Sequence, residues 1–243
     1  MIPAVAQPPS KASADPLRLL AATAIFDGMS ELELERLRPA LRARKFAKDS
    51  YLFREGDPGS HLYVVVQGEV KIVSVTESGA EIVFGVVGPG EVIGELSVFV
   101  EDGERSTDAV ALVTTECLAI PKEAVVSFFL DHPKLLLRLV TSLAAFVRRK
   151  DAAVAEVAFL DIPGRVANKL LELAESKGVR DGEAVTIRVP LSQRTLAGMV
   201  GASRENVNRT LSRFKELGYI TQSRGTITVL KPDELRRRGR SAV

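Results

Sequence analysis

The chain has 243 residues, 46% of them hydrophobic, and a formal net charge of +2 at pH 7. This length can bury a substantial core and favours two modest domains over one. The single cysteine, Cys117, excludes an internal disulfide and a cysteine-ligated iron–sulfur cluster. No apolar run reaches the length of a membrane span, and the first residues lack a secretory signal, so we expect a cytoplasmic protein without a membrane contact.

The charge is unevenly distributed along the chain. Residues 161–243 contain 16 basic and 9 acidic residues, a net charge of +7, whereas residues 1–160 contain 17 basic and 22 acidic residues, a net charge of −5. The C-terminal part is therefore the one that we expect to meet a polyanion. A solvated basic face is the simpler alternative.

The N-terminal part begins with a Pro- and Ala-rich segment, residues 1–15, which we expect to be a disordered tail. Residues 16–45 show the apolar spacing of short helices, and Ser30, followed by Glu31 and Glu33, is a suitable N-cap. We expect these helices to be scaffold.

From Phe46 onward the pattern changes to that of β-strands, with alternating or short apolar runs separated by Gly, Pro and Asp turn signals. Many short strands at roughly regular spacing predict a barrel or roll of about eight strands. The runs that predict strands lie at 51–53, 62–66, 70–75, 82–87 and 109–120.

A candidate anion site lies within this roll. Gly94, Glu95 and Leu96 can start a short helix whose free N–H groups point at an anion. Arg105 offers a planar fork of donors to phosphate oxygens, Ser106 adds a hydroxyl, and Glu95 can accept from a sugar hydroxyl. These residues predict a ribose-phosphate site, and a charged surface turn is the alternative.

Residues 133–157 show a long helical pattern, for which Asp131 is the expected N-cap. A long apolar stripe on a helix between two domains is best explained as the seam of a homodimer, although packing against the roll of its own chain is an alternative. The stripe contains Leu136, Leu139, Val140, Leu143, Phe146, Val147, Val154 and Val157. Asp161 and Pro163 then break the helix, which predicts a hinge and a domain boundary.

The C-terminal part contains a helix-turn-helix pattern. Ser192 and Ser203 can each cap a helix, and the residues between and after them have the required sizes. The small residue at the helix crossing, the glycine of the turn and the apolar residue of the second helix are Ala197, Gly201 and Val207. Any two-helix hairpin is the alternative.

The second helix of this motif begins with polar residues suited to base edges. Arg204 and Arg209 can each bond guanine in the major groove, and Glu205 can accept from the cytosine amino group. Residues 221–230 predict a wing hairpin with Arg224 near the DNA backbone. Residues 178–183 are expected to form a loop, and residues 236–240 a mobile basic tail that adds salt-sensitive affinity.

Four stretches together resemble the cAMP receptor protein (CRP/FNR) family of bacterial transcription regulators. The resemblance covers the cassette from Gly94 to Ala109, including its length, and three further segments: 54–68, 157–167 and 203–209. It implies that Glu95 bonds the ribose 2′-hydroxyl, and that Arg105 and Ser106 hold the cyclic phosphate. Thr107 stands where the best-known members have Ala, a change that should leave the backbone N–H available.

The resemblance weakens at Lys150 and Asp151, which stand where the family has the Thr and Ser that touch the adenine amino group from the two subunits. Asp can accept from an amino group and Lys can donate to a ring nitrogen or carbonyl, so a base contact stays open. Lys150 and Asp151 can instead form ion pairs with each other's symmetry mates across the dimer without any ligand. A third alternative is that they select another nucleotide. We keep cAMP as the expected ligand because the sugar-phosphate residues match.

For DNA, the resemblance implies a palindrome near TGTGA-N6-TCACA, read by Arg204, Glu205 and Arg209. It also implies that Ser192, Gln193 and Ser203 hold phosphates, which positions the helix without carrying sequence information. Asn206 and Asn208 differ from commoner residues of the family, so the flanking preference is open. Residues 178–183 correspond in position to the family's surface for RNA polymerase, which is therefore an expected partner.

The sequence thus predicts an α+β fold: a cyclic-nucleotide-binding, jelly-roll-like β-roll, a long dimerisation helix and a winged helix-turn-helix. The expected domains are a tail at 1–15, the roll at 16–130, the helix at 131–160 and the DNA-binding domain at 161–243. The expected function is that of a homodimeric, cAMP-controlled regulator of transcription.

Two alternatives remain, and an enzyme is not among the favoured ones. The first is the same DNA function without cAMP or with another ligand, and the second is a nucleotide-binding module that acts on a protein partner. No phosphate loop and no nucleophile with a base is evident. His61 and His132 have no partner at metal-ligand spacing, so no metal site is expected.

Overall fold

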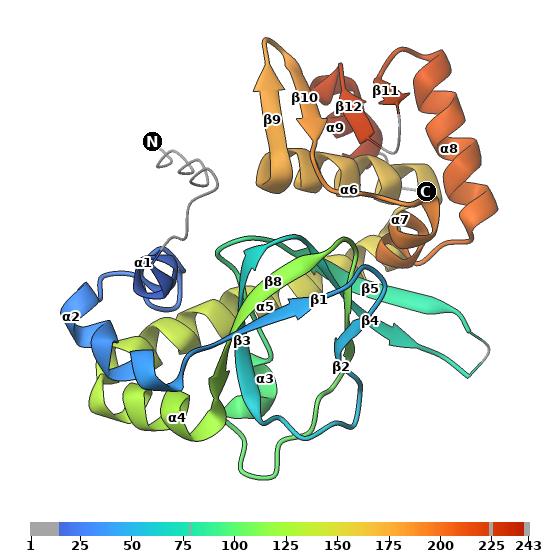
Figure 1. Ribbon diagram of the computed structural model, residues 1–243. Helices are drawn as coiled ribbons and strands as arrows, with labels where there is room; N and C mark the ends of the chain where they lie inside the picture. Colours follow the sequence, from blue (N-terminus) through green and yellow to red (C-terminus); the bar gives the residue numbers. More distant parts are fainter. Residues whose placement is uncertain (1–14, 78, 224–225, 241–243) are drawn as a thin grey trace. The chain divides into compact units, whose positions relative to one another are not determined.

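The computed structural model describes residues 15–77, 79–223 and 226–240 (Figure 1). The chain divides into two compact units, with the division inside the long helix between Leu143 and Ala144. The first unit takes in the chain up to Ile72 together with Val86–Leu143, and the second takes in Val73–Gly85 and the chain from Ala144.

Two four-stranded sheets form the predicted roll, in the orders β1-β8-β3-β6 and β2-β7-β4-β5. In the first sheet β8 lies between β1 and β3 and pairs antiparallel with both, as Figure 1 shows. The expectation of about eight strands is confirmed by β1(Arg42–Phe46), β2(Tyr51–Phe53), β3(His61–Gln67), β4(Val70–Val75), β5(Glu81–Val87), β6(Val92–Ile93), β7(Asp108–Ala111) and β8(Thr115–Pro121).

The roll is filled by a cluster of apolar side chains that come from alternate positions of its strands. The cluster includes Leu52, Val65, Ile93 and Cys117, with the rings of Phe53 and other aromatic residues packed against it. Burial raises the pKa of the Cys117 thiol to about 12, so this cysteine is an apolar filler at neutral pH.

A second cluster joins the roll to the helices of the first unit, which are α1(Pro16–Ala21), α2(Glu31–Leu34), the 3-10 helix η1(Glu35–Ala40), α4(Lys122–Asp131) and the start of α5(Pro133–Phe159). Phe26 is fully buried here, and its ring meets those of Phe128 and Phe129 edge to face. Ser30 caps α2 as predicted, and its hydroxyl and Glu33 form a reciprocal capping box.

Three predictions for the first unit are wrong. Residues 42–45, expected in helices, belong to β1, where four successive residues are exposed, so no alternation of buried and exposed residues marks the strand. The run 109–120 is two strands, β7 and β8, rather than one. Asp131 does not cap the long helix, because it is the last residue of α4, a helix that the sequence analysis missed.

The long helix α5 has two faces with different surroundings. Leu135 and Leu139 are buried in the core of the first unit, and Leu136 and Leu143 pack against it. At Leu136, Leu139 and Leu143 the predicted dimer seam is therefore wrong and the alternative holds, because these residues pack against the core of the same chain. Large apolar side chains on another face are exposed: Leu137, Val140, Val147 and Val154. With Ala144, Asp151 and Ala158 between and after them, these residues follow the alternating three- and four-residue steps of a heptad; we call this set the α5 seam.

In the second unit, helices pack on a four-stranded sheet of order β11-β12-β10-β9. The helix α6 contacts α7, α8, α9 and β10, so it is the centre of this unit (Figure 1). Asp161 caps α6 by accepting from Gly164 N at 2.9 Å. The elements are α6(Ile162–Lys177), β9(Gly178–Asp181), β10(Ala184–Ile187), α7(Gln193–Val200), α8(Arg204–Glu216), β11(Ile220–Ser223), β12(Thr226–Val229) and α9(Pro232–Arg240).

Two predictions for the second unit are corrected. Residues 178–183, expected to be a loop, contain β9 and the turn of the β9–β10 hairpin, where Gly182 takes the positive φ that a tight hairpin needs. The expected mobile tail at 236–240 is the end of helix α9, which Leu235 anchors in the core. Arg238 forms an ion pair with Asp161, and Asn168 Nδ2 donates to Gly239 O at 3.3 Å. The predicted wing is confirmed as the β11–β12 hairpin, but Arg224 lies outside the described residues. Of the expected tail at 1–15, residues 1–14 also lie outside them, and Asp15 is ordered as the N-cap of α1.

The α9 contacts make a prediction about stability. Replacing the fully buried Leu235 by Ala should lower the free energy of unfolding of the second unit by about 2–5 kcal/mol, because it leaves a cavity. The matched control is Arg236→Ala, which removes only an exposed ion pair with Asp233 and should cost less than about 1 kcal/mol. Denaturant unfolding measures both, and equal midpoints for the two variants would contradict the packed helix.

Candidate functional site

The backbone of the roll builds the predicted anion site around α3(Glu95–Val98). Gly94 precedes this short helix with a φ of +92°, a left-handed conformation that suits glycine. The segment that carries Arg105 is held against the turn at 56–59 by three backbone hydrogen bonds. Gly56 N donates to Arg105 O, Arg105 N donates to Asp57 O, and Gly59 N donates to Gly103 O, each at 2.8 Å.

The Arg105 side chain is the centre of this site and is only 4% exposed. Its Nη1 donates to Gly94 O at 3.0 Å and to Ser97 Oγ at 2.8 Å, and its Nη2 donates to His61 O at 2.6 Å. The guanidinium also stacks over the ring of Phe53, 4.2 Å from its centroid. A guanidinium has five N–H donors, and the buried Nε has no partner within the described part of the chain, so donors remain for an anion.

Gly94 is required by this arrangement for two reasons. Its φ is strained for any residue with a side chain, and a Cβ built on it would overlap Nη1 of Arg105. Gly90 also has a positive φ, but open space surrounds it. Comparing substitutions at the two glycines therefore distinguishes the effect of backbone strain from the effect of a clash with Arg105.

Glu95 is the second charged residue of the site. Burial raises the pKa of its carboxyl above the ordinary value, while its own backbone N–H, the charge of Arg105 and the Gly94 N–H act in the opposite direction. The structure thus brings Gly94, Glu95 and Arg105 together. Leu96 and Ser106 are exposed, and Thr107 is half-buried.

The sequence analysis missed three residues that support Arg105. Ser97 accepts from it through its hydroxyl, Phe53 covers its flat face, and His61 contributes a backbone carbonyl. The sequence contains a signal for Ser97, since a hydroxyl one turn after Gly94 lies on the same side of the helix. It contains none for His61, because any residue type can provide a backbone carbonyl.

The two residues expected to contact a base lie on α5. Asp151 is exposed and occupies a position of the α5 seam. The backbone of Lys150 is helical, but its side chain lies outside the described residues. Their predicted contact with a base therefore stays a prediction.

The second unit contains the predicted helix-turn-helix, formed by α7 and α8. Ser192 Oγ accepts from Thr195 N at 3.0 Å and Ser203 Oγ accepts from Asn206 N at 3.3 Å, which confirms both caps. Gly201 ends α7 with a φ of +59°, and Val207 is fully buried. Arg165 of α6 donates to Val200 O at 2.7 Å and so holds the turn between α7 and α8.

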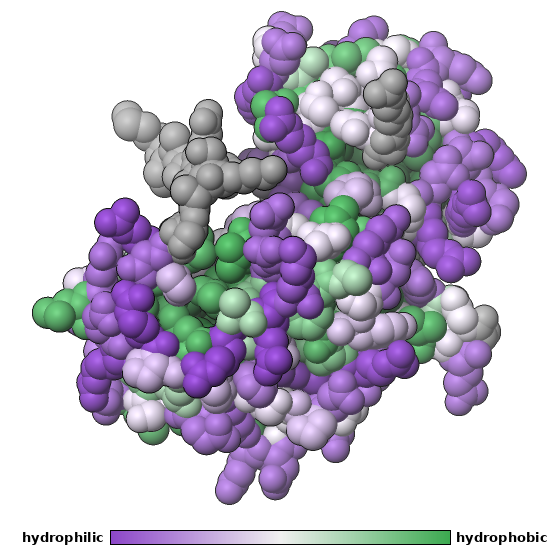
Figure 2. Space-filling model, in the orientation of Figure 1, coloured by the Kyte–Doolittle hydropathy of each residue, from purple (hydrophilic) through white to green (hydrophobic). Residues whose placement is uncertain are grey.

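The helix α8 buries one face and exposes another. Its buried face comprises Val207, Thr210, Leu211 and Phe214. Arg204, Glu205 and Arg209 are all exposed, and Figure 2 shows hydrophilic residues over α8 at the right of the view. The pKa of Glu205 is lowered by its own backbone N–H and by the Ser203 hydroxyl, so it is an ionised acceptor at neutral pH. This exposed face can enter a major groove.

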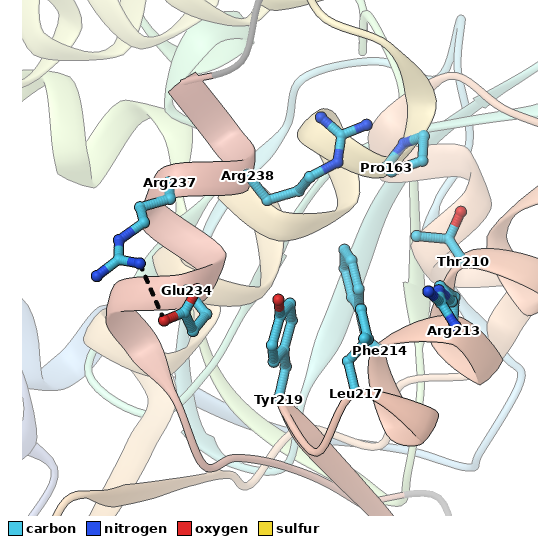
Figure 3. Close-up of a pocket in the computed structure, with 9 residues that line it drawn as sticks. All are labelled: Pro163, Thr210, Arg213, Phe214, Leu217, Tyr219, Glu234, Arg237 and Arg238. Carbon is cyan, nitrogen blue, oxygen red and sulfur yellow. Dashed lines mark ion pairs between the residues drawn. The ribbon is translucent and has the colours of Figure 1, made fainter.

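A separate hollow of about 450 Å³ lies between the start of α6, the second half of α8 and α9 (Figure 3). Phe214, Leu217 and Tyr219 form its apolar wall. Three arginines line it, but each is paired with a carboxylate: Arg213 with Glu216, Arg237 with Glu234, and Arg238 with Asp161. The pairing leaves no excess charge that would select an anion.

No group of three or more potential metal-ligating His, Cys, Asp or Glu side chains occurs within the described ranges. The same ranges contain no helix with the length and apolar character needed to cross a bilayer.

Comparison with known proteins matches both units. Residues 43–132 match the cyclic nucleotide-binding domain, and residues 164–238 match the Crp-like helix-turn-helix domain. A relative from Mycobacterium tuberculosis, named a CRP-like cAMP-activated global transcriptional regulator, is 33% identical over 91% of this chain and 99% of its own length. The chain belongs to the CRP/FNR family of transcription regulators. It is therefore a cyclic-nucleotide-binding regulator of transcription with a helix-turn-helix for DNA.

Two further relatives show the breadth of the family. The cyclic AMP receptor protein of Thermus thermophilus is 31% identical over 84% of this chain and 91% of its own length. The solved structure of a c-di-GMP responsive global regulator from Xanthomonas campestris has a TM-score of 0.70 and 25% identity, covering 82% of this chain and 99% of that one.

The contact between Gly94 and Arg105 makes a prediction about the ligand. Gly94→Ala should weaken cyclic nucleotide binding about 10- to 100-fold, because the added Cβ displaces the guanidinium from its charge-assisted contacts. Gly90→Ala is the matched control, since it shares the positive φ and meets open space. Calorimetric titration with cAMP and cGMP measures the effect, and an equal loss in both variants would assign it to backbone strain alone.

Proposed function

We propose that the chain is a homodimeric regulator that cAMP switches into a form with high affinity for a TGTGA-N6-TCACA-like palindrome. The observation that carries the proposal is the buried guanidinium of Arg105, held beside Glu95 with unused donors. In this proposal the donors of Arg105 and the hydroxyl of Ser106 hold the cyclic phosphate, and Glu95 accepts from the ribose 2′-hydroxyl. Gly94, Leu96 and Thr107 supply the backbone that surrounds the phosphate.

The choice of cAMP is supported by the names of two relatives, which describe a cAMP-activated regulator and a cyclic AMP receptor protein. Lys150 and Asp151 are proposed to contact the base. A carboxylate at position 151 can accept from the adenine amino group.

The homodimer is supported by the α5 seam. Its exposed apolar side chains recur at the spacing of a coiled coil, on a face of α5 other than the one that Leu135 and Leu139 bury in the core of the first unit. Exposed apolar surface of this length favours burial against a second copy, which also matches the two-fold symmetry of a palindrome.

The DNA contacts follow from the exposed face of α8. Arg204 and Arg209 are proposed to bond guanine, and Glu205 is proposed to accept from cytosine. By resemblance, Ser192, Gln193 and Ser203 are proposed to hold phosphates, from the N-terminal ends of the two helices that Ser192 and Ser203 cap. Arg224 is proposed to lie near the backbone. By the same resemblance, RNA polymerase would contact the β9–β10 hairpin.

A second candidate keeps the DNA function and changes the ligand. The exposed carboxylate of Asp151 on the α5 seam favours it, since two such carboxylates meet in a symmetric dimer and differ from the hydroxyls of the family. A structural relative that is named c-di-GMP responsive supports the same view.

One experiment separates these candidates. DNA affinity for the TGTGA palindrome should rise about 5- to 100-fold with cAMP over the nucleotide-free protein, which is the usual range for coupling between two sites. The measurement compares no nucleotide, cAMP and cGMP on the palindrome and on a scrambled duplex, with calorimetry of each nucleotide and Arg105→Ala as control. Equal DNA affinity in all three states, with no heat of binding, would exclude the cAMP switch.

The α5 seam makes a separate prediction about assembly. Val154→Glu, at a 71% exposed seam position, should convert the dimer into a monomer, because it replaces an apolar contact by a second pair of facing carboxylates, one turn after the pair from Asp151. Ala153→Glu adds the same charge at an exposed position outside the seam and should leave the dimer intact. Analytical ultracentrifugation distinguishes them, and a wild-type monomer at micromolar concentration would contradict the homodimer.

A further inference from the structure

A lysine side chain reaches the loop that follows α3, residues 99–104, which we call the α3 loop. Lys122, the first residue of α4, donates through Nζ to Val100 O at 2.5 Å and to Glu101 O at 2.9 Å. Its backbone N–H donates to Ser60 O at 2.9 Å, just before β3 begins. Lys122 therefore ties the start of α4 both to the α3 loop and to the start of β3.

The ammonium of Lys122 binds two neutral backbone carbonyls, whereas Lys45 and Lys169 pair with carboxylates. Holding a long side chain in one conformation costs entropy, which a lysine ordinarily avoids by staying solvated. The same two carbonyls accept from Gly103 N, at 3.2 Å and 2.6 Å, and so close a tight turn. Because a carbonyl oxygen has two lone pairs, each can accept from both donors. The position of the lysine thus fixes the position of this turn.

The other side of the α3 loop packs closely against the residues that hold Arg105. Gly59 N donates to Gly103 O at 2.8 Å. A Cβ on Gly59 would lie 2.7 Å from both Ser97 Oγ and Gly103 O, and a Cβ on Gly103 would lie 2.2 Å from Ser97 O. Ser97 Oγ in turn accepts from Arg105 Nη1 at 2.8 Å. A contact this close has no room for independent movement, so a shift of the α3 loop displaces an acceptor of the guanidinium.

We propose that Lys122 is a positioning residue for the cyclic nucleotide, which acts on Arg105 through the α3 loop and Ser97. Its two hydrogen bonds hold the outer half of the loop, and the close packing on the other side transmits that position to the guanidinium. The contribution comes from the N–H donors of the ammonium rather than from its charge. The inference rests on the proposed role of Arg105 and names a residue outside the segment 94–109 that sets the affinity for the ligand.

The first test is Lys122→Met in the full-length protein, which keeps an unbranched side chain and removes the donors. The Kd for cAMP should rise about tenfold, because a charge-assisted contact of Arg105 is weakened. The dissociation rate should carry most of this change, since the residue positions the site and does not steer the ligand. Lys45→Met is the matched control, because it removes the same charge from an ion pair with Glu116. Calorimetry and stopped-flow displacement measure both variants.

The second test restores either the donors or the charge alone. The thiol of Lys122→Cys is treated with a methanethiosulfonate that adds an ethylammonium group, or with one that adds an ethyltrimethylammonium group. Each forms a disulfide and releases methanesulfinate, but only the first supplies N–H donors. Cys117 is 1% exposed and burial raises its pKa to about 12, so the wild type is the unreactive control. The ethylammonium group should restore the wild-type Kd to within about threefold, and the ethyltrimethylammonium group should not.

A third measurement does not depend on the ligand and separates this inference from the proposed function. Without nucleotide, Lys122→Met should speed hydrogen exchange of the α3 loop amides and leave the β9–β10 hairpin unchanged. A wild type that binds neither cAMP nor cGMP removes the proposed function itself.

The inference fails on a different set of results. If the wild type binds nucleotide, an unchanged Kd in Lys122→Met or an equal loss in Lys45→Met overturns it. Rescue by both reagents assigns the effect to charge and overturns it too, as does unchanged exchange of the α3 loop. The thermal unfolding midpoint of each variant confirms that it is folded.

Discussion

The buried charge of Arg105 constrains the rest of the first unit. Removing a guanidinium from water costs several kcal/mol unless acceptors replace the lost water. Here Gly94 O, Ser97 Oγ and His61 O provide that replacement, and Phe53 covers the flat face. The carbonyl of Gly94 reaches Nη1 only because this residue has no side chain. Strand ends, turn and short helix are therefore arranged so that one cation is buried while some of its donors stay unused.

A site of this kind favours an anion that arrives with its own acceptors. A phosphate bonded by Nε satisfies a buried donor that has no partner in the described part of the chain, so its binding recovers a cost already present in the free protein. The nearby carboxylate of Glu95 has its pKa raised by burial, and its acceptor capacity is best used by a hydroxyl. A sugar-phosphate meets both demands together, whereas a simple anion meets only the first.

In the second unit, most charged side chains are ion-paired or exposed rather than buried without a charged partner. Several of its arginines outside the exposed face of α8 are paired with carboxylates, as in Arg238 with Asp161 and Arg237 with Glu234. Arg204 and Arg209 are exposed on α8, where serine caps and the buried Val207 fix the helix that carries them. The unit thus neutralises charge where it packs and presents charge where a polyanion would lie.

The sequence predicted those features whose physical cause is local. The helix caps at Ser30, Asp161, Ser192 and Ser203 were predictable because a cap depends on a few neighbouring residues. The acceptors around Arg105 were not predictable, since two of the three are backbone carbonyls and one comes from a strand 44 residues away.

Helix α9 was predictable only in part. Pro232, Asp233 and Glu234 followed by arginines are the charge pattern of a helix, with acids at its start and bases at its end. The arginine run alone indicated a solvated tail, and only the burial of Leu235 against α6 decides between the two, because a short helix gains its stability from the packing of its apolar face.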